Sequence, residues 1–269
     1  MTADARLMGI SPDGARRPVT REWVGEVPVA LEFNGVTYAV MMATPADLED
    51  FTLGFALNEG LAASPAEIGQ IDVTEVAEGW IARAALYGPG AERISDRARA
   101  RVAESSCGLC GIENLKALAQ PLPLVAPHAE IEAAAVFAAL AALRDHQPLS
   151  QATGAAHAAA HADASGRITM AREDVGRHNA LDKLVGAMAR AGQPLGGGFV
   201  LSSARCSFEI VEKAVRAGAT SLVTVSLPTS LAVERARAAG LSLWVLGRAD
   251  SVLLANAAGR PPGVSDQAR

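Results

Sequence analysis

Hydrophobic and polar positions alternate along residues 27–42, which predicts two β-strands at 27–33 and 36–42. Asn34-Gly35 separates them, and this dipeptide is typical of a type I′ hairpin turn. Thr44-Pro45-Ala46-Asp47 then predicts a helix start, with an acidic first turn and an end near Gly60. Two further strands are predicted at 69–77 and 80–87. The N-terminal part should therefore be a small α+β unit.

The second half of the chain alternates between strand and helix patterns. Prolines at 121, 123 and 127 break the chain, and a helix is predicted at about 130–144. Strands are then predicted at 167–172, 198–203, 221–226 and 241–246, and helices at 179–191, 208–217 and 231–239. This alternation favours a largely parallel sheet covered by helices on both faces. Ligands on such sheets bind at the carboxyl ends of strands, here the loops after Met170, Val200, Val225 and Val245.

These patterns predict an α/β protein of two domains. We expect an N-terminal α+β domain at 19–125, which carries a thiol loop, and a C-terminal α/β domain at 126–257. The polar ends, 1–18 and 258–269, are expected to be disordered.

Composition narrows the function classes. Half of the 269 residues are hydrophobic, which fits a globular protein, and the net charge of −5 argues against nonspecific nucleic-acid binding. No apolar run is long enough to span a bilayer, and the first 20 residues lack the pattern of a signal peptide. We therefore expect a cytoplasmic protein in a reducing compartment, where a disulfide scaffold is disfavoured.

The strongest chemical signal is the stretch Cys107-Gly108-Leu109-Cys110-Gly111. A helical pattern follows it at once, so the thiols should lie just before a helix N-terminus, where the dipole favours thiolate. The flanking glycines remove side-chain cover and permit unusual backbone angles. Such a pair can bind metal, cycle as a disulfide or carry sulfur as a persulfide.

Several readings of the thiols stay open on the residues alone. A zinc site needs four ligands, and only His157 and His161 could complete one. A thioredoxin-type exchange lacks the usual strand and helix context, and inert packing is disfavoured by the glycines. Zinc deaminases combine H-x-E with a later P-C-x-x-C, whereas His128-Ala129-Glu130 here follows the thiols and no proline precedes Cys107.

Two polar turns between predicted strands and helices add candidate binding groups. The run 172–179 contains Arg172 and Arg177, which suit bidentate binding of phosphate or carboxylate, and His178, which could act as an acid or base. Residues 202–209 offer hydroxyls at a helix start that could hold an anion. Ordinary helix capping is the plainer reading of either turn, and Cys206 is expected to serve packing.

Together these segments resemble the FdhD family of formate dehydrogenase accessory sulfurtransferases. The resemblance rests on Cys-Gly-Leu-Cys-Gly at 107–111 and on the run from Arg172 to Leu184. It implies that sulfane sulfur from a cysteine desulfurase passes to the molybdenum of bis-(molybdopterin guanine dinucleotide), which then enters the catalytic subunit of formate dehydrogenase. By position, Cys107 matches the persulfide-forming cysteine and Cys110 the second thiol. The family also implies a homodimer, a C-terminal domain similar to the cytidine deaminase fold, and no permanently bound metal.

The guanine-dinucleotide segment of the family matches Leu246-Gly247-Arg248-Ala249-Asp250-Ser251. The family has an aromatic residue where this chain has Leu246, so stacking on a base would be lost. Asp250 adds negative charge near phosphates. The resemblance assigns cofactor binding to these six residues together with Arg172, Arg177 and His178. Two rival functions remain: a cofactor-binding chaperone without sulfur transfer, and a zinc or redox C-x-x-C protein.

Overall fold

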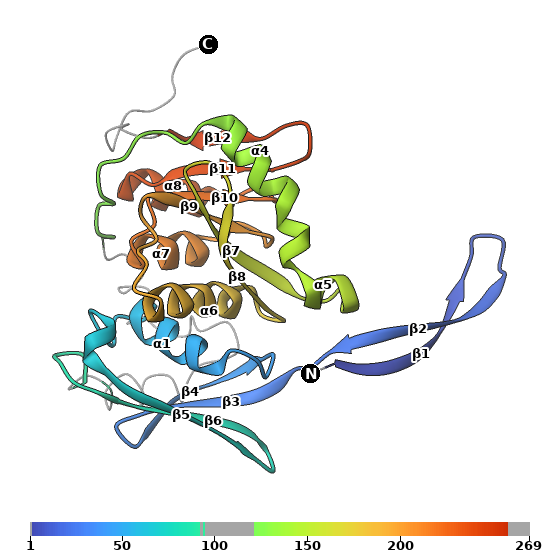
Figure 1. The fold of residues 1–269 in the computed structure, drawn as a ribbon, viewed down its shortest axis with the longest axis horizontal. Helices are drawn as coiled ribbons and strands as arrows, with labels where there is room; N and C mark the ends of the chain where they lie inside the picture. The colour runs from blue at the N-terminus through green and yellow to red at the C-terminus, as the bar shows by residue number, and fades with distance from the viewer. Residues whose placement is uncertain (1, 92–93, 95–120, 258–269) are drawn as a thin grey trace.

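A computed structural model of the chain describes residues 2–91, 94 and 121–257 (Figure 1). The elements follow one another as β1 (Thr2–Ile10), β2 (Arg16–Val24), β3 (Val27–Phe33), β4 (Val36–Ala43), α1 (Leu48–Asn58), a 3-10 turn η1 (Pro65–Glu67), β5 (Ile68–Val76), β6 (Gly79–Leu86), α4 (Ala133–Ala142), a 3-10 turn η3 (Leu143–His146), α5 (Pro148–Thr153), β7 (His157–Asp163), β8 (Ile168–Asp174), α6 (Arg177–Arg190), β9 (Gly198–Ser202), α7 (Phe208–Arg216), β10 (Ser221–Thr224), α8 (Ser230–Ala239), β11 (Ser242–Val245) and β12 (Leu253–Asn256).

The predicted N-terminal elements are confirmed. β3 and β4 pair as a hairpin around Asn34-Gly35, whose φ angles of 51° and 77° are those of a type I′ turn. The sheet order is β4-β3-β6-β5, and α1 covers one face. Alternation places Val29, Leu31 and Phe33 on that face, where they are fully buried. On the opposite face, Val40 and Met42 are exposed.

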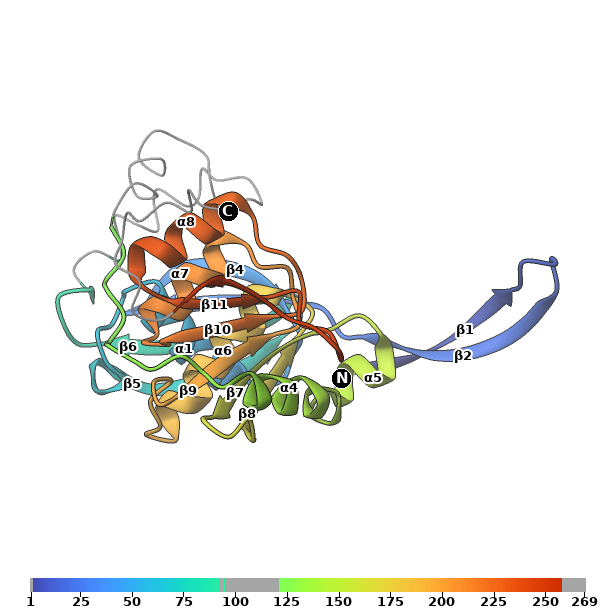
Figure 2. The ribbon, with the colours of Figure 1, turned by 90° about the horizontal axis from the view of Figure 1, so that it is seen from above.

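The second sheet has the strand order β12-β11-β10-β9-β7-β8. Helices α6, α7 and α8 pack on one face and α4 on the other, which makes three layers (Figures 1 and 2). The expectation of a largely parallel sheet is corrected, because only the β9–β10 and β10–β11 pairs are parallel. β7 and β12 run antiparallel to their neighbours. The mixed α/β character is as predicted, and the likeness to the cytidine deaminase fold stays a prediction.

The N-terminal segment differs from the expected disordered end. β1 and β2 pair over their whole length and form an arm that projects from the body in both views (Figures 1 and 2). Most described residues of β2 are exposed or half-buried, as its polar composition suggests. The predicted disordered tail, 258–269, lies outside the described residues.

The two halves of the chain meet where α1 crosses α6. Gly54 of α1 faces the carbonyl oxygen of Asp182, and Gly186 of α6 faces that of Asp50, so closely that a Cβ at either glycine would overlap the opposite backbone. Two glycines therefore let these helices approach backbone to backbone. α1 is thus covered by the small sheet on one side and by α6 on the other (Figure 1). The domain boundary at 125/126 stays a prediction.

Within the described part of the chain, no helix has both the length and the apolar character needed to cross a membrane.

Candidate functional site

One edge of the six-stranded sheet gathers most of the candidate residues. β8, β9, β10 and β11 run in the same direction, so their carboxyl ends lie together with the amino end of antiparallel β7. The helices α6, α7 and α8 begin directly after β8, β9 and β10. Three helix N-termini, each a site of partial positive charge, therefore face the same edge. We call it the carboxyl edge.

Backbone hydrogen bonds join the loops of the carboxyl edge into a continuous row. Ser203 and Ala158 link the loop after β9 to the start of β7 through Ser203 N to Ala158 O (2.9 Å) and Ala158 N to Ser203 Oγ (2.8 Å). Thr229 N donates to Cys206 O (3.0 Å), which joins the loops after β9 and β10. Leu246 N donates to Ser226 O (3.2 Å), which adds the loop after β11. With strands about 4.8 Å apart, the row from β8 to β11 spans about 19 Å.

Arg177 and His178 begin α6 at one end of this row. His178 Nε2 lies 3.2 Å from Glu209 Oε2, and an Arg177 guanidinium nitrogen lies 3.8 Å from the same oxygen. The contact with His178 is the main cause that lowers the pKa of Glu209, with smaller contributions from Ser207 and Arg177. Arg177 Nε is buried and has no hydrogen-bond partner among the described residues. A donor group therefore remains unsatisfied here.

His157 stands at the start of β7, close to the same cations. Burial is the main cause that lowers its pKa, and the positive charges of Arg177, Arg205 and His178 lower it further. The imidazole is therefore neutral near pH 7 and can donate or accept a hydrogen bond. Arg205, in the loop after β9, is exposed. Sequence reasoning considered His157 only as a possible zinc ligand and gave Arg205 no role of its own, because their proximity depends on the pairing of β7 with β9.

Two of the three helix N-termini have no side-chain cap among the described residues. α6 has Gly176 at its N-cap, which offers no side chain, and α7 has Ser207, whose hydroxyl contacts Glu209 (3.0 Å) instead of capping. At α8, by contrast, Thr229 Oγ1 accepts from Ala232 N (3.2 Å). Backbone N–H groups at the first two helices are thus available for an anion.

The segment Leu246–Ser251 forms the other end of the row, directly after β11. Leu246 has a φ of 52°, and Gly247 packs so closely on Leu140 that a Cβ would lie 2.9 Å from its methyl carbons. Gly247 N donates to Thr224 O (3.0 Å) and Arg248 Nη1 donates to Val225 O (2.7 Å), so this turn is held against β10. Arg248, Ala249, Asp250 and Ser251 are exposed. The predicted cofactor segment and Arg177–His178 therefore share one edge.

Arg172 does not belong to this set. Its guanidinium nitrogens lie 2.8 Å from Asp50 Oδ2 in α1 and 3.7 Å from Asp47. Arg190 of α6 binds the other oxygen of Asp50 at 2.9 Å. Arg172 is two residues before the end of β8 and serves the junction with α1, where its charge is already balanced by carboxylates.

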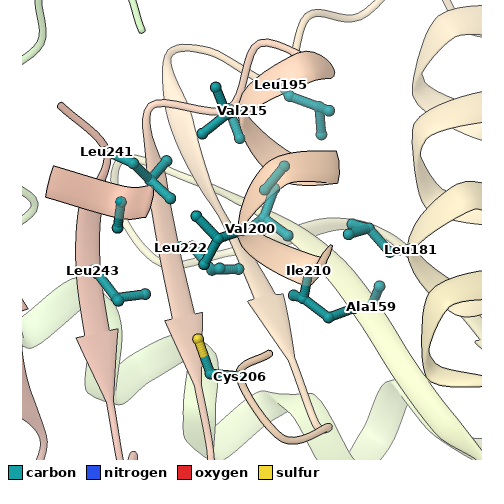
Figure 3. Close-up of a cluster of buried hydrophobic side chains, with 14 of the residues drawn as sticks. Ala159, Leu181, Leu195, Val200, Cys206, Ile210, Val215, Leu222, Leu241 and Leu243 are labelled. Atoms are coloured by element: carbon teal, nitrogen blue, oxygen red, sulfur yellow. The ribbon is translucent and has the colours of Figure 1, made fainter. Parts of the chain in front are cut away.

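The cysteines divide into one described thiol and two that are not. Cys206 is fully buried among leucines and valines of the sheet and helices (Figure 3), and burial raises its pKa to about 11. It is therefore a packing residue, as predicted, because a thiol at such a pKa supplies almost no thiolate. Cys107 and Cys110 lie outside the described residues.

Metal ligation was another reading of the histidines. Among the described residues, no cluster of three or more His, Cys, Asp and Glu side chains is suited to hold a metal ion. His157 and His161 lie four strand residues apart, about 13 Å along β7, too far to ligate one ion together. His161 is instead buried, with Nδ1 2.7 Å from Thr169 Oγ1.

Comparison with known proteins agrees with the sequence motifs. Residues 24–260 match the model of the FdhD/NarQ family. A sulfur carrier protein FdhD from Chromobacterium violaceum is 47% identical over 234 residues, 86% of this chain and 87% of its own. Another from Bordetella petrii is 46% identical over 218 residues, 81% and 78% of the two chains. A crystal structure named as a formate dehydrogenase accessory protein, from Desulfotalea psychrophila, shares the fold with a TM-score of 0.74 at 24% identity and covers 97% of this chain and 99% of its own. On this evidence the chain belongs to the FdhD/NarQ family.

Proposed function

We propose that this protein is a cytoplasmic sulfurtransferase that prepares the molybdenum cofactor of a formate dehydrogenase. It receives persulfide sulfur from a cysteine desulfurase on Cys107, with Cys110 as the assisting thiol. It then transfers that sulfur to the molybdenum of bis-(molybdopterin guanine dinucleotide), which it binds as substrate. The formate dehydrogenase catalytic subunit accepts the product, and the carrier works as a homodimer.

One observation carries the cofactor side of this proposal. The carboxyl edge combines open helix N-termini, Arg177 with an unsatisfied buried Nε, and Arg248 at the far end of the same row. A large ligand with two diphosphate groups needs hydrogen-bond donors that are spread over a wide area. The row from β8 to β11, about 19 Å long, is wide enough to receive both groups. Leu246 offers the guanine an aliphatic contact where the family has an aromatic ring.

The sulfur side follows from thiol chemistry. The Cys107 thiolate attacks the outer sulfur of the desulfurase persulfide, a new S–S bond forms, and the desulfurase cysteine leaves as a thiolate. The S–S bond on Cys107 would then break as the outer sulfur bonds to a reduced molybdenum centre of the substrate, which supplies the two electrons that make this sulfur a sulfido ligand, and Cys107 leaves as a thiolate. A thiol of ordinary or lowered pKa is required, which separates this role from the buried Cys206.

Loss of Cys107 tests the role in cells. In a strain without its own carrier, Cys107→Ala should leave formate dehydrogenase made but inactive, as measured by immunoblot and formate oxidation. Cys206→Ala is the matched control and should support full activity. Normal activity with Cys107→Ala would refute sulfur transfer and favour a chaperone that only holds the cofactor.

A further inference from the structure

His157 is a histidine of the carboxyl edge whose ring has no fixed partner. It is the first residue of β7 and lies opposite Asp174, the last residue of β8. Its side chain is half-buried, and neither ring nitrogen has a hydrogen-bond partner among the described residues. His178, by contrast, already lies 3.2 Å from Glu209. The ring of His157 is therefore available to a ligand at this edge.

The backbone around His157 is held next to two sources of positive charge. Ala158 N donates to Ser203 Oγ (2.8 Å) and Ala158 O accepts from Ser203 N (2.9 Å), so the start of β7 is fixed against the loop that carries Arg205. On the other side, β8 ends opposite His157, and α6 begins three residues later with Arg177. His157 thus stands between a cationic loop and a cationic helix start.

The cations around His157 oppose its protonation while no anion is bound. Burial is the main cause that lowers its pKa, and the charges of Arg177, Arg205 and His178 lower it further. The same cations, together with the uncapped N-termini of α6 and α7, attract an anion. A bound anion offsets their charge, so the imidazole then takes up a proton more readily. The imidazolium has an N–H on each ring nitrogen and can donate to the anion.

The carboxylates near His157 are already engaged by other groups. Asp174 lies 2.6 Å from Lys183, and its charge raises the pKa of His157 less than any of the other causes lower it. Glu173 accepts from two backbone N–H groups at the start of α5 (2.7 and 2.8 Å). Glu209 contacts the side chains at the start of α6. An anion from outside is therefore needed to hold a second proton on His157.

We propose that His157 is a phosphate-binding residue that takes up a proton from solvent when the diphosphate of a nucleotide binds at the carboxyl edge. The proton adds to the free ring nitrogen, and no other bond forms or breaks. Binding at this end of the edge should therefore weaken as the pH rises. The inference rests on the proposed function for the identity of the nucleotide, whereas the response of His157 to an anion does not depend on sulfur transfer.

Calorimetry with GDP-mannose tests the coupling, because both phosphates of this diphosphate diester stay ionised near neutral pH. Titrations of the full chain at pH 7 in two buffers of different ionisation enthalpy should show uptake of up to about one proton per ligand. Binding should be up to about 10-fold weaker at about pH 8 than at about pH 6. His157→Gln should bind without this uptake and with little pH dependence.

His128→Gln is the matched control and should behave like the parent. The ring of His128 contacts Ser242, which begins β11 and so lies at the opposite edge of the sheet. Binding of GDP-mannose without proton uptake, or equal uptake by the parent and His157→Gln, would overturn the proposal.

Sulfate separates this inference from cofactor binding, since it is an anion without a base that does not titrate near neutral pH. NMR of the parent chain follows the ring of His157 through a pH titration. Sulfate should raise the pKa of His157 by about one unit relative to chloride at equal ionic strength. Such a rise without any binding of GDP-mannose would support the anion site and refute the proposed nucleotide. An unchanged pKa with both probes would overturn the inference, and if GDP-mannose still bound, the proposed function would stand.

Discussion

Two charged clusters lie side by side in this protein, and they differ in whether their polar groups have hydrogen-bond partners. At the junction of the two halves, Lys183 and Asp174 are completely buried, 2.6 Å apart. Thr44, Gly176 and Asn179 make further hydrogen bonds with this pair. At the carboxyl edge, Arg177 Nε is buried without a partner among the described residues, and two helix N-termini lack side-chain caps. A satisfied cluster holds the fold together, whereas an unsatisfied one is prepared for a ligand.

Both clusters draw on the same stretch of sequence, 172–184. Arg172, Asp174 and Lys183 turn toward the N-terminal half, while Arg177 and His178 turn toward the carboxyl edge. The position of the site therefore depends on the junction, because Asp174 receives the Gly176 N–H (2.7 Å) that sets the start of α6. The predictions below separate the two roles, from the largest expected effect to the smallest.

Breaking the buried pair should have the largest effect. Lys183→Met leaves the Asp174 carboxylate buried without its cation, and such losses cost about 3–5 kcal/mol. Urea denaturation should show this fall in the free energy of unfolding. The double variant Lys183→Met with Asp174→Asn should recover much of it, because no uncompensated charge remains. A single variant as stable as the parent would show that the pair does not join the halves.

The glycine crossing of α1 and α6 should come next. In Gly54→Ala the new Cβ would overlap the Asp182 carbonyl, so the helices must separate, at a cost of about 1–3 kcal/mol. Thermal and urea unfolding measure the change. Gly196→Ala is the control, since its Cβ would meet only one atom, Gly218 O at 3.7 Å. Equal stability of the two variants would contradict a backbone-close crossing.

Changes at the carboxyl edge should alter binding rather than stability. Arg177→Gln should weaken the binding of GDP, used as a probe, about 10-fold to 100-fold, the range expected for loss of hydrogen bonds from a charged donor. Glu209→Gln should strengthen it, because Glu209 competes for the same cations. Calorimetry gives both affinities. If both variants bound GDP as tightly as the parent, the carboxyl edge would not be part of the proposed cofactor site.

The pH dependence should be the smallest effect. Because burial lowers the pKa of His157, the folded state binds its proton less readily than the unfolded chain. Stability should therefore fall as the pH drops below about 6.5, where only the unfolded imidazole is protonated. The lowered pKa of Glu209 acts in a lower window, because its contribution is lost only as the pH falls below about 4.5. In His157→Gln, the urea midpoint should change less between pH 7.5 and 5.5. An identical slope in parent and variant would place His157 in an ordinary environment.

Local signals in the sequence predicted much of the fold. The dipeptide Asn34-Gly35 correctly predicted the turn between β3 and β4. The alternation of strand and helix patterns from residue 179 correctly predicted α6, α7, α8 and β9 to β11. β7 was missed because His157–Asp163 consists of alanines, histidines and one aspartate, which have little preference for strand. In the sheet, β7 lies between β8 and β9. Its pairing with β9 joins residues far apart in the sequence, such as Ala160 and Leu201, and local patterns do not record such pairing.

The binding roles of the candidate residues stay predictions, and the structure shows only which of them lie together. Arg177, His178 and Leu246–Ser251 follow strands and could be assigned to an edge, and the structure brings them to one edge. Arg172 has the same local pattern, but Asp50 in α1 takes its charge, and that contact spans 122 residues. His157 and Arg205 join the site only through the pairing of β7 with β9. Local patterns could therefore place only those candidate residues whose position depends on their own loop.

The account depends most on a sulfur atom carried by Cys107. The direct measurement is the intact mass of the full chain after incubation with a cysteine desulfurase and cysteine, followed by peptide mapping. We expect a gain of about 32 Da, one sulfur atom, on the peptide with Cys107 and none on the peptide with Cys206. A loaded desulfurase with no gain on Cys107, or a thiol pair recovered with bound zinc, would contradict sulfur transfer.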